Sequence, residues 1–427
     1  MMPNGWEIKT LDAAKVVVTD GDRGKEYPKS SDFSEDGYCL FLSAKNVTKR
    51  GFSFSEKQFI SKDKHEKLRK GLVNRGDIVL TTRGTVGQFS FYDESITYEP
   101  IRINSGMVTL SFTNADIKND FFYALSKSSI IKKQIDLAAF GSAQPQLTVK
   151  IIKSLKLPVP PLPEQRKIAK ILSTWDKAIS TTERLIDNSK QQKKALMQQL
   201  LTGKKRLLDD SGKPFEGEWE EVKLDDIARY HKGYTYKSSE YSEESTLYGF
   251  LTLKSFLRGG GYSSKGIKYL LSPVDEKFSV IEGDLIFAVT DLTRNAEVVG
   301  APVLVPNLEF EKSYISMDIV KLDVDKCVDK TFLFYLLKIR RNRNFMRARA
   351  SGSTVLHLDV KGSKKLKLRL PKLKSEQCRI ATVLINADKE IELLEQQLTD
   401  LKQEKKAMMQ QLLTGKRRVK VDKKEVA

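Results

Sequence analysis

The 427-residue sequence is 40% hydrophobic and 30% charged, a mixture typical of globular domains and not of disordered chains. Its length allows two or three domains, and its 74 Lys plus Arg against 55 Asp plus Glu give a formal net charge of +19. This surplus favours a polyanionic partner such as nucleic acid, although a generally basic surface or binding to acidic lipid would also explain it.

Residues 1–157 are predicted to form a mixed α/β domain with short strands. The segments YCLFLSAKNV, GDIVLTTRGTVGQFSFY and INSGMVTLSF have strand character and are interrupted by Gly, Asn and Asp. The segment NDFFYALSKSSIIKKQIDLAAFG then predicts one helix with basic character.

Residues 158–203 are predicted to contain a long helix. Its PPLPEQ start ends a strand and places Pro163 near the first helical turn, and Gly203 stands where a C-terminal glycine belongs. Apolar or small residues recur at alternating steps of four and three, which is the seam of a coiled coil. The seam comprises Ile168, Leu172, Trp175, Ile179, Thr182, Ile186, Ser189, Leu196 and Leu200.

Residues 204–218 are polar, contain Gly and Pro, and suit a linker. Residues 219–369 predict a second mixed α/β domain, with strands in YGFLTLKSF, GDLIFAVTDL, EVVGAPVLV and ISMDIVKLDV. The segment DKTFLFYLLKIRRNRNFMRARASG predicts another helix with basic character.

Residues 370–415 repeat the long helix, with Ser375 as its candidate N-cap and Gly415 at its C-terminal end, and a basic tail, 416–427, follows. Residues 406–416 read KAMMQQLLTGK and match KALMQQLLTGK at ten of eleven positions, 212 residues apart. The chain is therefore a tandem duplication. Its matching ends and differing centres suggest one mechanical role performed twice and two separate recognition roles. The second seam comprises Ile380, Leu384, Ala387, Ile391, Leu394, Leu398, Leu401, Met408 and Leu412.

A long exposed helix with one apolar stripe is unstable without a partner. We therefore expect an α+β fold in which two mixed α/β domains are separated by two long helices, packed as an antiparallel coiled coil with pseudo-twofold symmetry. The alternatives are that each helix covers its own domain, or that helices pair between the chains of a homodimer.

The sequence also lacks the common motifs for catalysis, metal binding and membrane insertion. The three cysteines and three histidines are scattered, so neither a disulfide framework nor a zinc site is expected. The sequence contains no phosphate-binding GKS or GKT loop, no Asn- or Asp-Pro-Pro-aromatic methylation motif, no nucleophile elbow and no HExxH. It also contains no apolar run of about 20 residues and no secretory signal pattern. We expect a cytoplasmic, non-catalytic protein.

These features together resemble the specificity subunits of Type I restriction-modification systems, over essentially the whole chain. The resemblance rests on the starts WEIKTL and WEEVKL, on GDIVLTTRGTVG and GDLIFAV, on GSAQPQLT, and above all on LPVPPLPEQRKIAKIL with KKALMQQLLTGKKR. The second copy departs from the pattern, because LPKLKSEQ replaces PPLPEQ and GSTVLHLD replaces GSAQPQLT. This departure weakens residue-by-residue transfer in the second domain and leaves the architecture unchanged.

The resemblance implies a subunit that binds double-stranded DNA and joins two methyltransferase subunits, to which two motor-nuclease subunits can be added. It implies a two-part asymmetric target, with one half-site read by each target-recognition domain and the helices setting the gap. No cofactor is expected on this chain, since S-adenosylmethionine would bind the methyltransferase, and ATP and Mg²⁺ the motor-nuclease.

Candidate DNA contacts are polar and basic residues near predicted strand ends, because such side chains pair with phosphates or base edges. The alternative for Arg83 and Asn104 is that they stabilise turns, and the alternative for Gln144 and Gln146 is that they merely cap the strand before the long helix. In the first domain the candidates are Lys45, Asn46, Lys49, Arg50, Thr82, Arg83, Thr85, Arg102, Asn104, Gln144 and Gln146.

The second domain offers corresponding candidates and the densest basic cluster of the chain. That cluster favours phosphate contact, with a solvated charged face as the alternative. The candidates are Lys254, Arg258, Thr290, Arg294 and Ser316, with Arg340, Arg341, Arg343, Arg347 and Arg349 in the cluster.

Two other functions would fit a basic protein with this organisation. One is a standalone architectural or regulatory DNA-binding protein, which would bind tightly without partners and with little sequence preference. The other is a self-contained methyltransferase or nuclease, which would turn over DNA without another subunit.

Overall fold

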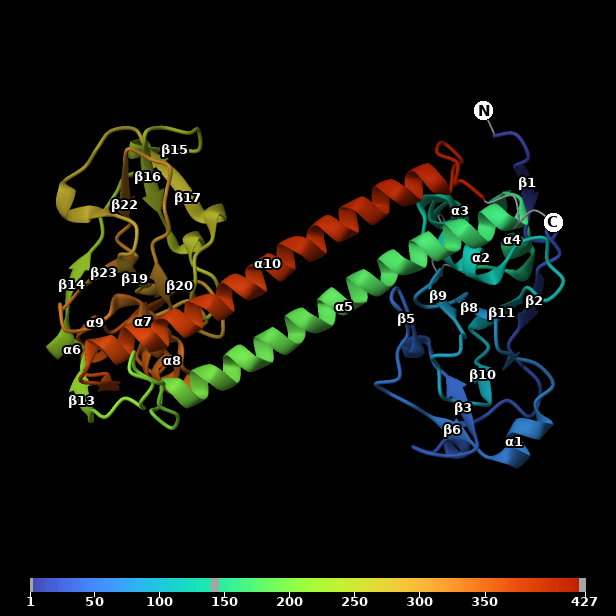
Figure 1. Ribbon diagram of the computed structural model, residues 1–427, viewed down its shortest axis with the longest axis horizontal. Helices are drawn as coiled ribbons and strands as arrows, with labels where there is room; N and C mark the ends of the chain where they lie inside the picture. Colours follow the sequence, from blue (N-terminus) through green and yellow to red (C-terminus); the bar gives the residue numbers. More distant parts are fainter. Residues whose placement is uncertain (1–2, 140–145, 422–427) are drawn as a thin grey trace. The chain divides into compact units, whose positions relative to one another are not determined.

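The computed structural model describes residues 3–139 and 146–421. The chain divides into two compact units, Met1–Glu183 with Gln396–Ala427, and Arg184–Glu395. Each unit combines one α/β domain with part of each of two long helices, α5 (Leu162–Leu200) and α10 (Lys374–Leu412) (Figure 1). Each helix has 39 residues, which corresponds to roughly 58 Å at 1.5 Å per residue.

The first unit is built from short strands with helices beside them. Its strands are β1 (Glu7–Thr10), β2 (Val17–Asp20), β3 (Cys39–Leu42), β4 (Val47–Thr48), β5 (Gly51–Phe52), β6 (Phe59–Ile60), β7 (Leu72–Val73), β8 (Ile78–Thr81), β9 (Phe89–Phe91), β10 (Ile101–Ile103), β11 (Met107–Ser111) and β12 (Lys156–Val159). Its shorter helices are α1 (Lys62–Lys67), α2 (Asn119–Ser126), α3 (Ser129–Ala139) and α4 (Val149–Lys153).

The second unit follows the same plan with additional short strands. Its strands are β13 (Trp219–Lys223), β14 (Ala228–Lys232), β15 (Tyr241–Ser242), β16 (Tyr248–Leu251), β17 (Ile267–Leu270), β18 (Ser279–Val280), β19 (Leu285–Ala288), β20 (Thr290–Asp291), β21 (Pro302–Leu304), β22 (Lys312–Ile315), β23 (Ile319–Val324), β24 (Ala350–Ser351), β25 (Leu356–Leu358) and β26 (Lys367–Pro371). Its shorter helices are α6 (Leu224–Ile227), α7 (Lys330–Lys338), α8 (Arg340–Arg347) and α9 (Val360–Ser363).

The two domains have the same strand connectivity although their central sequences differ. The sheet order β2-β11-β8-β9 corresponds to β14-β23-β19-β21, and β6-β3-β10-β7 corresponds to β17-β16-β22-β18. Even the single parallel pairing of the second sheet recurs, as β3 with β10 and β16 with β22. The pair β1-β12 corresponds to β13-β26. The duplication therefore includes the recognition domains and not only the long helices.

The prediction of one basic helix in each domain is wrong, because each segment forms two helices. Lys127 and Ser128 separate α2 from α3, where the Ser128 hydroxyl accepts a hydrogen bond from the amide of Ile130 (3.2 Å). Ile339 separates α7 from α8 because its backbone is extended, with φ −65° and ψ 148°. The chain turns at these points so that each helix can pack separately.

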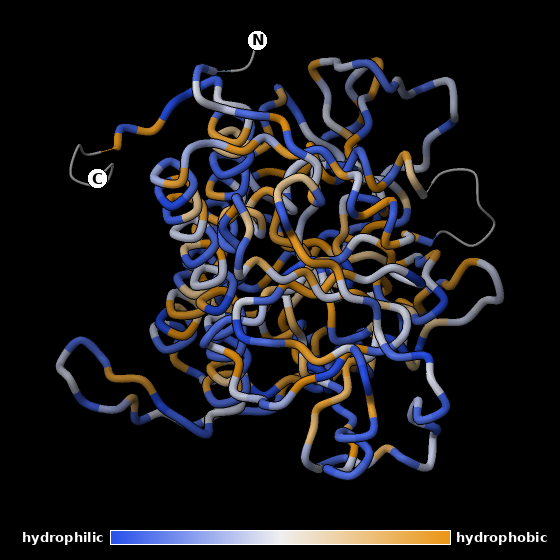
Figure 2. The backbone as a smooth tube through the Cα atoms, turned by 90° about the vertical axis from the view of Figure 1, so that its right-hand side faces the viewer, coloured by the Kyte–Doolittle hydropathy of each residue, from blue (hydrophilic) through white to orange (hydrophobic). Residues whose placement is uncertain are grey.

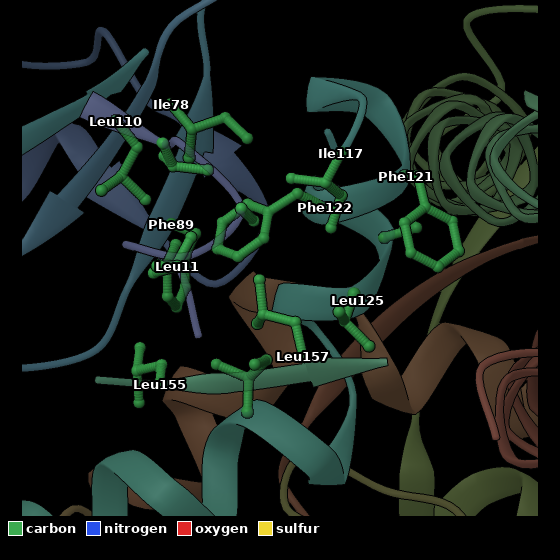
Figure 3. Packing of buried hydrophobic residues seen from close by; sticks show 14 of the residues in the cluster. Leu11, Ile78, Phe89, Leu110, Ile117, Phe121, Phe122, Leu125, Leu155 and Leu157 are labelled. Carbon is green, nitrogen blue, oxygen red and sulfur yellow. The ribbon is translucent and has the colours of Figure 1, made fainter. Parts of the chain in front are cut away.

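The core of the first domain lies between its β2-β11-β8-β9 sheet and α2. Phe122 of α2 points toward the sheet residues Phe89 and Leu110 (Figure 3), and its ring centroid lies 6.0 Å from that of Phe89. Leu412 and Leu413, at the end of α10, belong to this same buried cluster. Figure 2 shows hydrophobic stretches among the packed elements, while the projecting loops carry both hydrophilic and hydrophobic residues.

The two long helices pair antiparallel in both units, which confirms the predicted coiled coil. Every seam residue predicted on α5 and α10 is buried or half-buried. The ion pairs between the helices occur twice, with the partners exchanged by the 212-residue offset. They are Lys402–Glu183 (2.8 Å) and Lys405–Asp176 (2.6 Å) in the first unit, and Lys190–Glu395 (2.7 Å) and Lys193–Asp388 in the second.

The repeated Glu-Gln pair at the start of each long helix has two structural roles. Glu376 is fully buried and accepts two hydrogen bonds from Arg206, at 2.6 and 2.8 Å. Its counterpart Glu164 binds Arg418 in the same way. Each helix start is thereby joined to the segment that follows the other helix.

The neighbouring glutamines join each long helix to its own domain. The side chain of Gln165 accepts from the amide of Lys118 (2.7 Å), and that of Gln377 accepts from the amide of Asp329 (2.8 Å). Both side chains are almost completely buried. The Glu-Gln pair therefore recurs in both copies because its two consecutive side chains make two different connections: the glutamate joins the helix to the segment after the other helix, and the glutamine joins it to its own domain.

Glycines end both long helices, as predicted. Gly203 and Gly415 have φ angles of +71° and +70°, a left-handed conformation that lets the chain leave the last turn. Ser375 lies inside the first turn of α10 rather than before it. No helix among the described residues is long and apolar enough to cross a membrane.

Candidate nucleic-acid interface

Three loops of the first domain meet where its central strands end. They are residues 21–24 after β2, residues 82–88 after β8, and the turn 104–106 between β10 and β11. The amide of Thr82 donates to Gly106 O (2.8 Å), and that of Gly21 donates to Met107 O (3.3 Å). This convergence forms a continuous surface of backbone turns from which side chains can project.

Arg83 and Thr85 are exposed on the second of these loops, whereas Thr82 is buried. The carbonyl of Thr82 accepts a hydrogen bond from the amide of Leu147 (3.1 Å), which brings the exposed Gln146 beside the Arg83 loop. Gln144 lies outside the described residues. Arg83, Thr85 and Gln146 are therefore the predicted residues that this corner brings together.

Asn104 and Arg102 have structural contacts near the same corner. The side chain of Asn104 accepts from the amide of Gly106 (2.8 Å) and so stabilises the turn. Arg102 is only 6% exposed and donates to Leu68 O (3.0 Å) and Lys70 O (2.7 Å). Burial lowers its pKa. Arg102 joins β10 to the segment after α1, and its guanidinium does not face solvent.

The predicted cluster around residues 45–50 is also divided. Asn46 is 1% exposed, accepts from the amide of Ser43 (2.8 Å), and donates to the carbonyls of Ser53 and Glu56. Lys45 is exposed and forms an ion pair with Glu56 (2.6 Å). Asn46 thus shapes the loop, and only its neighbours project from it.

Lys49 and Arg50 follow on the surface of the β4-β5 hairpin. Arg50 lies 3.6 Å from Glu183 of α5. With Arg50 83% exposed, this contact leaves the guanidinium available to solvent on most sides.

The second domain brings together the same three loops. The amide of Val289 donates to Asp318 O (2.8 Å), and that of Gly233 donates to Ile319 O (3.0 Å). Thr290 and Ser316 are buried at this corner, and the Ser316 hydroxyl has no hydrogen-bond partner among the described residues. Arg294 is exposed on the loop between β20 and β21.

The segment from Lys254 to Tyr262, which turns back on itself at an isolated antiparallel bridge between Phe256 and Tyr262, lies beside that loop. Lys254 and Arg258 are both exposed. Arg258 forms an ion pair with Glu297 (3.3 Å), and the amide of Gly259 donates to Glu297 O (2.9 Å). The structure therefore places Arg258 next to the loop that carries Arg294.

The basic cluster of α8 and the residues just after it does not form one solvent-facing surface. Arg343 is 4% exposed, and Arg347 is half-buried. Arg349 lies over the ring of Phe345, 3.4 Å from its centroid. Arg340 and Arg341 are exposed. Burial, with the neighbouring charge of Arg347, lowers the pKa of Arg343 to about 10.

Six of the candidates are thus interior residues, and their burial assigns them to the scaffold of the loops. They are Asn46, Thr82, Arg102, Thr290, Ser316 and Arg343. The Arg294 loop also exposes Leu292 and Asn295, which were not among the predicted contacts. Their position just after a buried strand, like that of Arg83, was the available signal.

No cluster of three or more His, Cys, Asp or Glu side chains within the described ranges could hold a metal ion. The fold and the loop corners define a duplicated protein with two related domains on paired helices. The family described as the Type I restriction modification DNA specificity domain matches residues 3–189 and 216–403. The chain belongs to this family and contains the domain twice.

Known proteins agree with this membership. The MjaVIII specificity subunit of a Type I restriction enzyme from Methanocaldococcus jannaschii is 28% identical over 98% of this chain and 94% of its own. The solved S subunit of a Type-I restriction-modification system from M. genitalium aligns with a TM-score of 0.62 at 15% identity, covering 97% and 98% of the two chains.

A structure that describes complex assembly and conformational transition of the type I R-M system aligns with a TM-score of 0.52 at 18% identity, covering 97% of this chain and 98% of the other. At such identities the two solved structures support the fold. Family membership confirms the predicted non-catalytic specificity subunit.

Proposed function

We propose that this chain selects an asymmetric two-part DNA target for a Type I restriction-modification complex. One half-site is read by residues 1–157 and the other by residues 219–369. The observation that carries this proposal is that the two domains share one strand topology but differ at corresponding corners. The segment between β8 and β9 spans residues 82–88, whereas the segment between β19 and β21, which includes the short strand β20, extends from 289 to 301. Two domains with the same strand scaffold but different loops are suited to reading two different half-site sequences.

The proposed contact surface consists of the exposed candidates. Guanidinium groups suit guanine edges and phosphates, and amides suit adenine. In the first domain these are Lys45, Lys49, Arg50, Arg83, Thr85 and Gln146, and in the second Lys254, Arg258, Arg294, Arg340 and Arg341.

The paired helices, residues 158–203 and 370–415, act in this proposal as the spacer that sets the gap between half-sites. In this proposal the linker 204–218 follows the first spacer helix, and the basic tail 416–427 follows the second. The helix surface outside the seam offers docking for two methyltransferase subunits, which hold S-adenosylmethionine. Two motor-nuclease subunits, which use ATP and Mg²⁺, complete the complex where the system has them. We place this complex in the cytoplasm with its DNA.

Genome-wide methylation mapping tests the proposal. A host with the gene should carry methylation at one bipartite, asymmetric motif, and removal of the gene should abolish it. Arg83→Ala should alter preference in one half-site and leave the other unchanged. Equal loss in both half-sites would contradict the assignment of one reader to each half.

The two other candidate functions give different outcomes. Turnover of DNA by the purified chain with S-adenosylmethionine and Mg²⁺ would identify it as a self-contained enzyme. Tight binding to DNA of any sequence, with no effect of this gene on methylation, would identify an architectural protein.

A further inference from the structure

The loop 292–297 of the second domain is held in one compact conformation from within. Asp291, which is fully buried, accepts hydrogen bonds from the amides of Thr293 (2.6 Å), Val298 (2.6 Å) and Val299 (2.7 Å). Burial alone would raise the pKa of this carboxyl, but the hydrogen bonds outweigh it and lower the pKa, so the group is a carboxylate at neutral pH. One side chain thus closes both ends of the loop.

Two arginines hold the same loop from the adjacent helix α8. Arg343 Nη2 donates to Glu297 O (3.1 Å), and Arg347 Nε donates to Ala296 O (3.0 Å). Ala296 has a φ of +50°, a strained conformation for a residue other than glycine. Contacts to its carbonyl and to the next one therefore stabilise a backbone shape that the sequence alone disfavours.

The exposed side chains of this loop have the chemistry of base recognition. Leu292 is 67% exposed, and Arg294 and Asn295 are also exposed. Arg294 and Asn295 make no side-chain hydrogen bond or ion pair within the part of the chain that the structure describes. Arg pairs bidentately with guanine, Asn with adenine, and an apolar side chain contacts the thymine methyl group. Three reading groups lie within four residues.

We propose that loop 292–297 is a preformed base-reading element, in which Leu292, Arg294 and Asn295 contact base edges. Asp291, Arg343 and Arg347 act as positioning residues. This inference rests on the proposed function and deepens it by naming the specificity-determining residues of the second domain. A loop that is already ordered loses less conformational entropy when it binds.

This assignment separates two roles among the arginines of α8, the helix labelled in the second unit in Figure 1. A phosphate contact requires an exposed cation, whereas the guanidinium of Arg343 is buried and that of Arg347 is directed at a loop carbonyl. Arg340 is exposed on the same helix and belongs to the proposed contact surface as a phosphate contact, so its removal deletes the same charge without touching the loop and gives the comparison for a phosphate role.

The first experiment selects duplexes from a randomised DNA library with the full-length chain and its methyltransferase partner. Arg294→Ala and Asn295→Ala should each relax base preference about tenfold or more at one or two base pairs. These positions should fall in the same half-site, and the other half-site should stay unchanged. Variants that leave both half-sites intact would overturn the inference.

The second experiment measures affinity against salt for the selected duplex and for a scrambled duplex. Arg347→Ala should weaken the selected duplex about tenfold, leave the scrambled duplex unchanged, and keep the salt slope. A phosphate contact would instead weaken both duplexes alike and reduce the slope by about one. Either of those results would overturn the positioning role. Arg340→Ala, at a proposed phosphate contact, should weaken both duplexes alike and reduce the salt slope, without changing the base preferences.

Folding and function can be separated in these tests. Arg343→Ala removes a buried group and can prevent folding, so Arg347→Ala and the loop variants carry the inference. If the unaltered complex selects no bipartite sequence, the proposed function fails. If the unaltered complex does select a bipartite sequence, but the loop variants leave both half-sites unchanged, the proposed function stands and loop 292–297 does not read bases.

Discussion

The duplicated joint between the helix ends allows one prediction with an internal control. In the second unit, Arg206 has 26% of its side chain exposed, and its partner Glu376 has none. In the first unit, Arg418 is 44% exposed and Glu164 is 7% exposed. Glu164 also accepts a hydrogen bond from the indole of Trp6 (3.3 Å). The two joints are chemically equal but differ in solvation.

Arg206→Ala should therefore destabilise its unit more than Arg418→Ala destabilises the other. Loss of Arg206 leaves a fully buried carboxylate without its cation, which costs about 3–5 kcal/mol. Loss of Arg418 leaves a carboxylate that keeps its indole donor and gains water, which costs about 2 kcal/mol. The free energies of local opening can be measured by hydrogen exchange in residues 200–219 and in residues 3–8 and 412–421.

A double variant tests the physical cause. Adding Glu376→Gln to Arg206→Ala removes the unpaired charge, so it should recover about 2 kcal/mol of the loss. Equal costs at the two joints, or a double variant as unstable as the sum of the single changes, would refute the reasoning.

Three further predictions concern the domain anchors and the helices. Burial and the charge of Lys193 lower the pKa of Lys338 to about 8 from 10.5. Between these two pH values the folded state binds fewer protons than the unfolded state, so the stability contributed by this group rises with pH there. Lys338→Met should therefore raise the melting temperature at pH 7 and reduce that rise, and an unchanged difference in melting temperature between pH 7 and pH 10 would contradict this prediction. Gln377→Ala should lower the free energy of unfolding, measured with denaturant, by about 2–4 kcal/mol, because it leaves the amide of Asp329 and the carbonyl of Pro371 without partners. A loss below 1 kcal/mol would contradict the role of Gln377 in joining α10 to its domain. Seven residues inserted at paired positions of both α5 and α10 add about 10 Å to each helix. Methylation mapping should then show that the gap between the two half-sites is about three base pairs wider. Altered half-site sequences would exclude a spacer role.

The sequence determined the features that depend on local periodicity and on the duplication. Seam residues such as Ile186 and Ile391 recur at helical spacing, so the pattern predicted their burial, and the structure decided that the buried face packs against the other long helix of the same chain. Gly203 and Gly415 marked both helix ends for a reason internal to the chain, since glycine adopts positive φ at little cost. The family resemblance rested on these same repeated segments.

Tertiary structure decided which polar residues reach the surface. Arg102 and Arg294 are both basic and near strand ends, yet one is buried and one is exposed. Arg102 is buried because carbonyls of Leu68 and Lys70, more than thirty residues earlier, accept its hydrogen bonds. Exposure is set by such long-range contacts, which leave no periodic trace in the sequence. For the same reason the arginines of α8 read as one cluster, while folding directs two of them to the loop that carries Arg294.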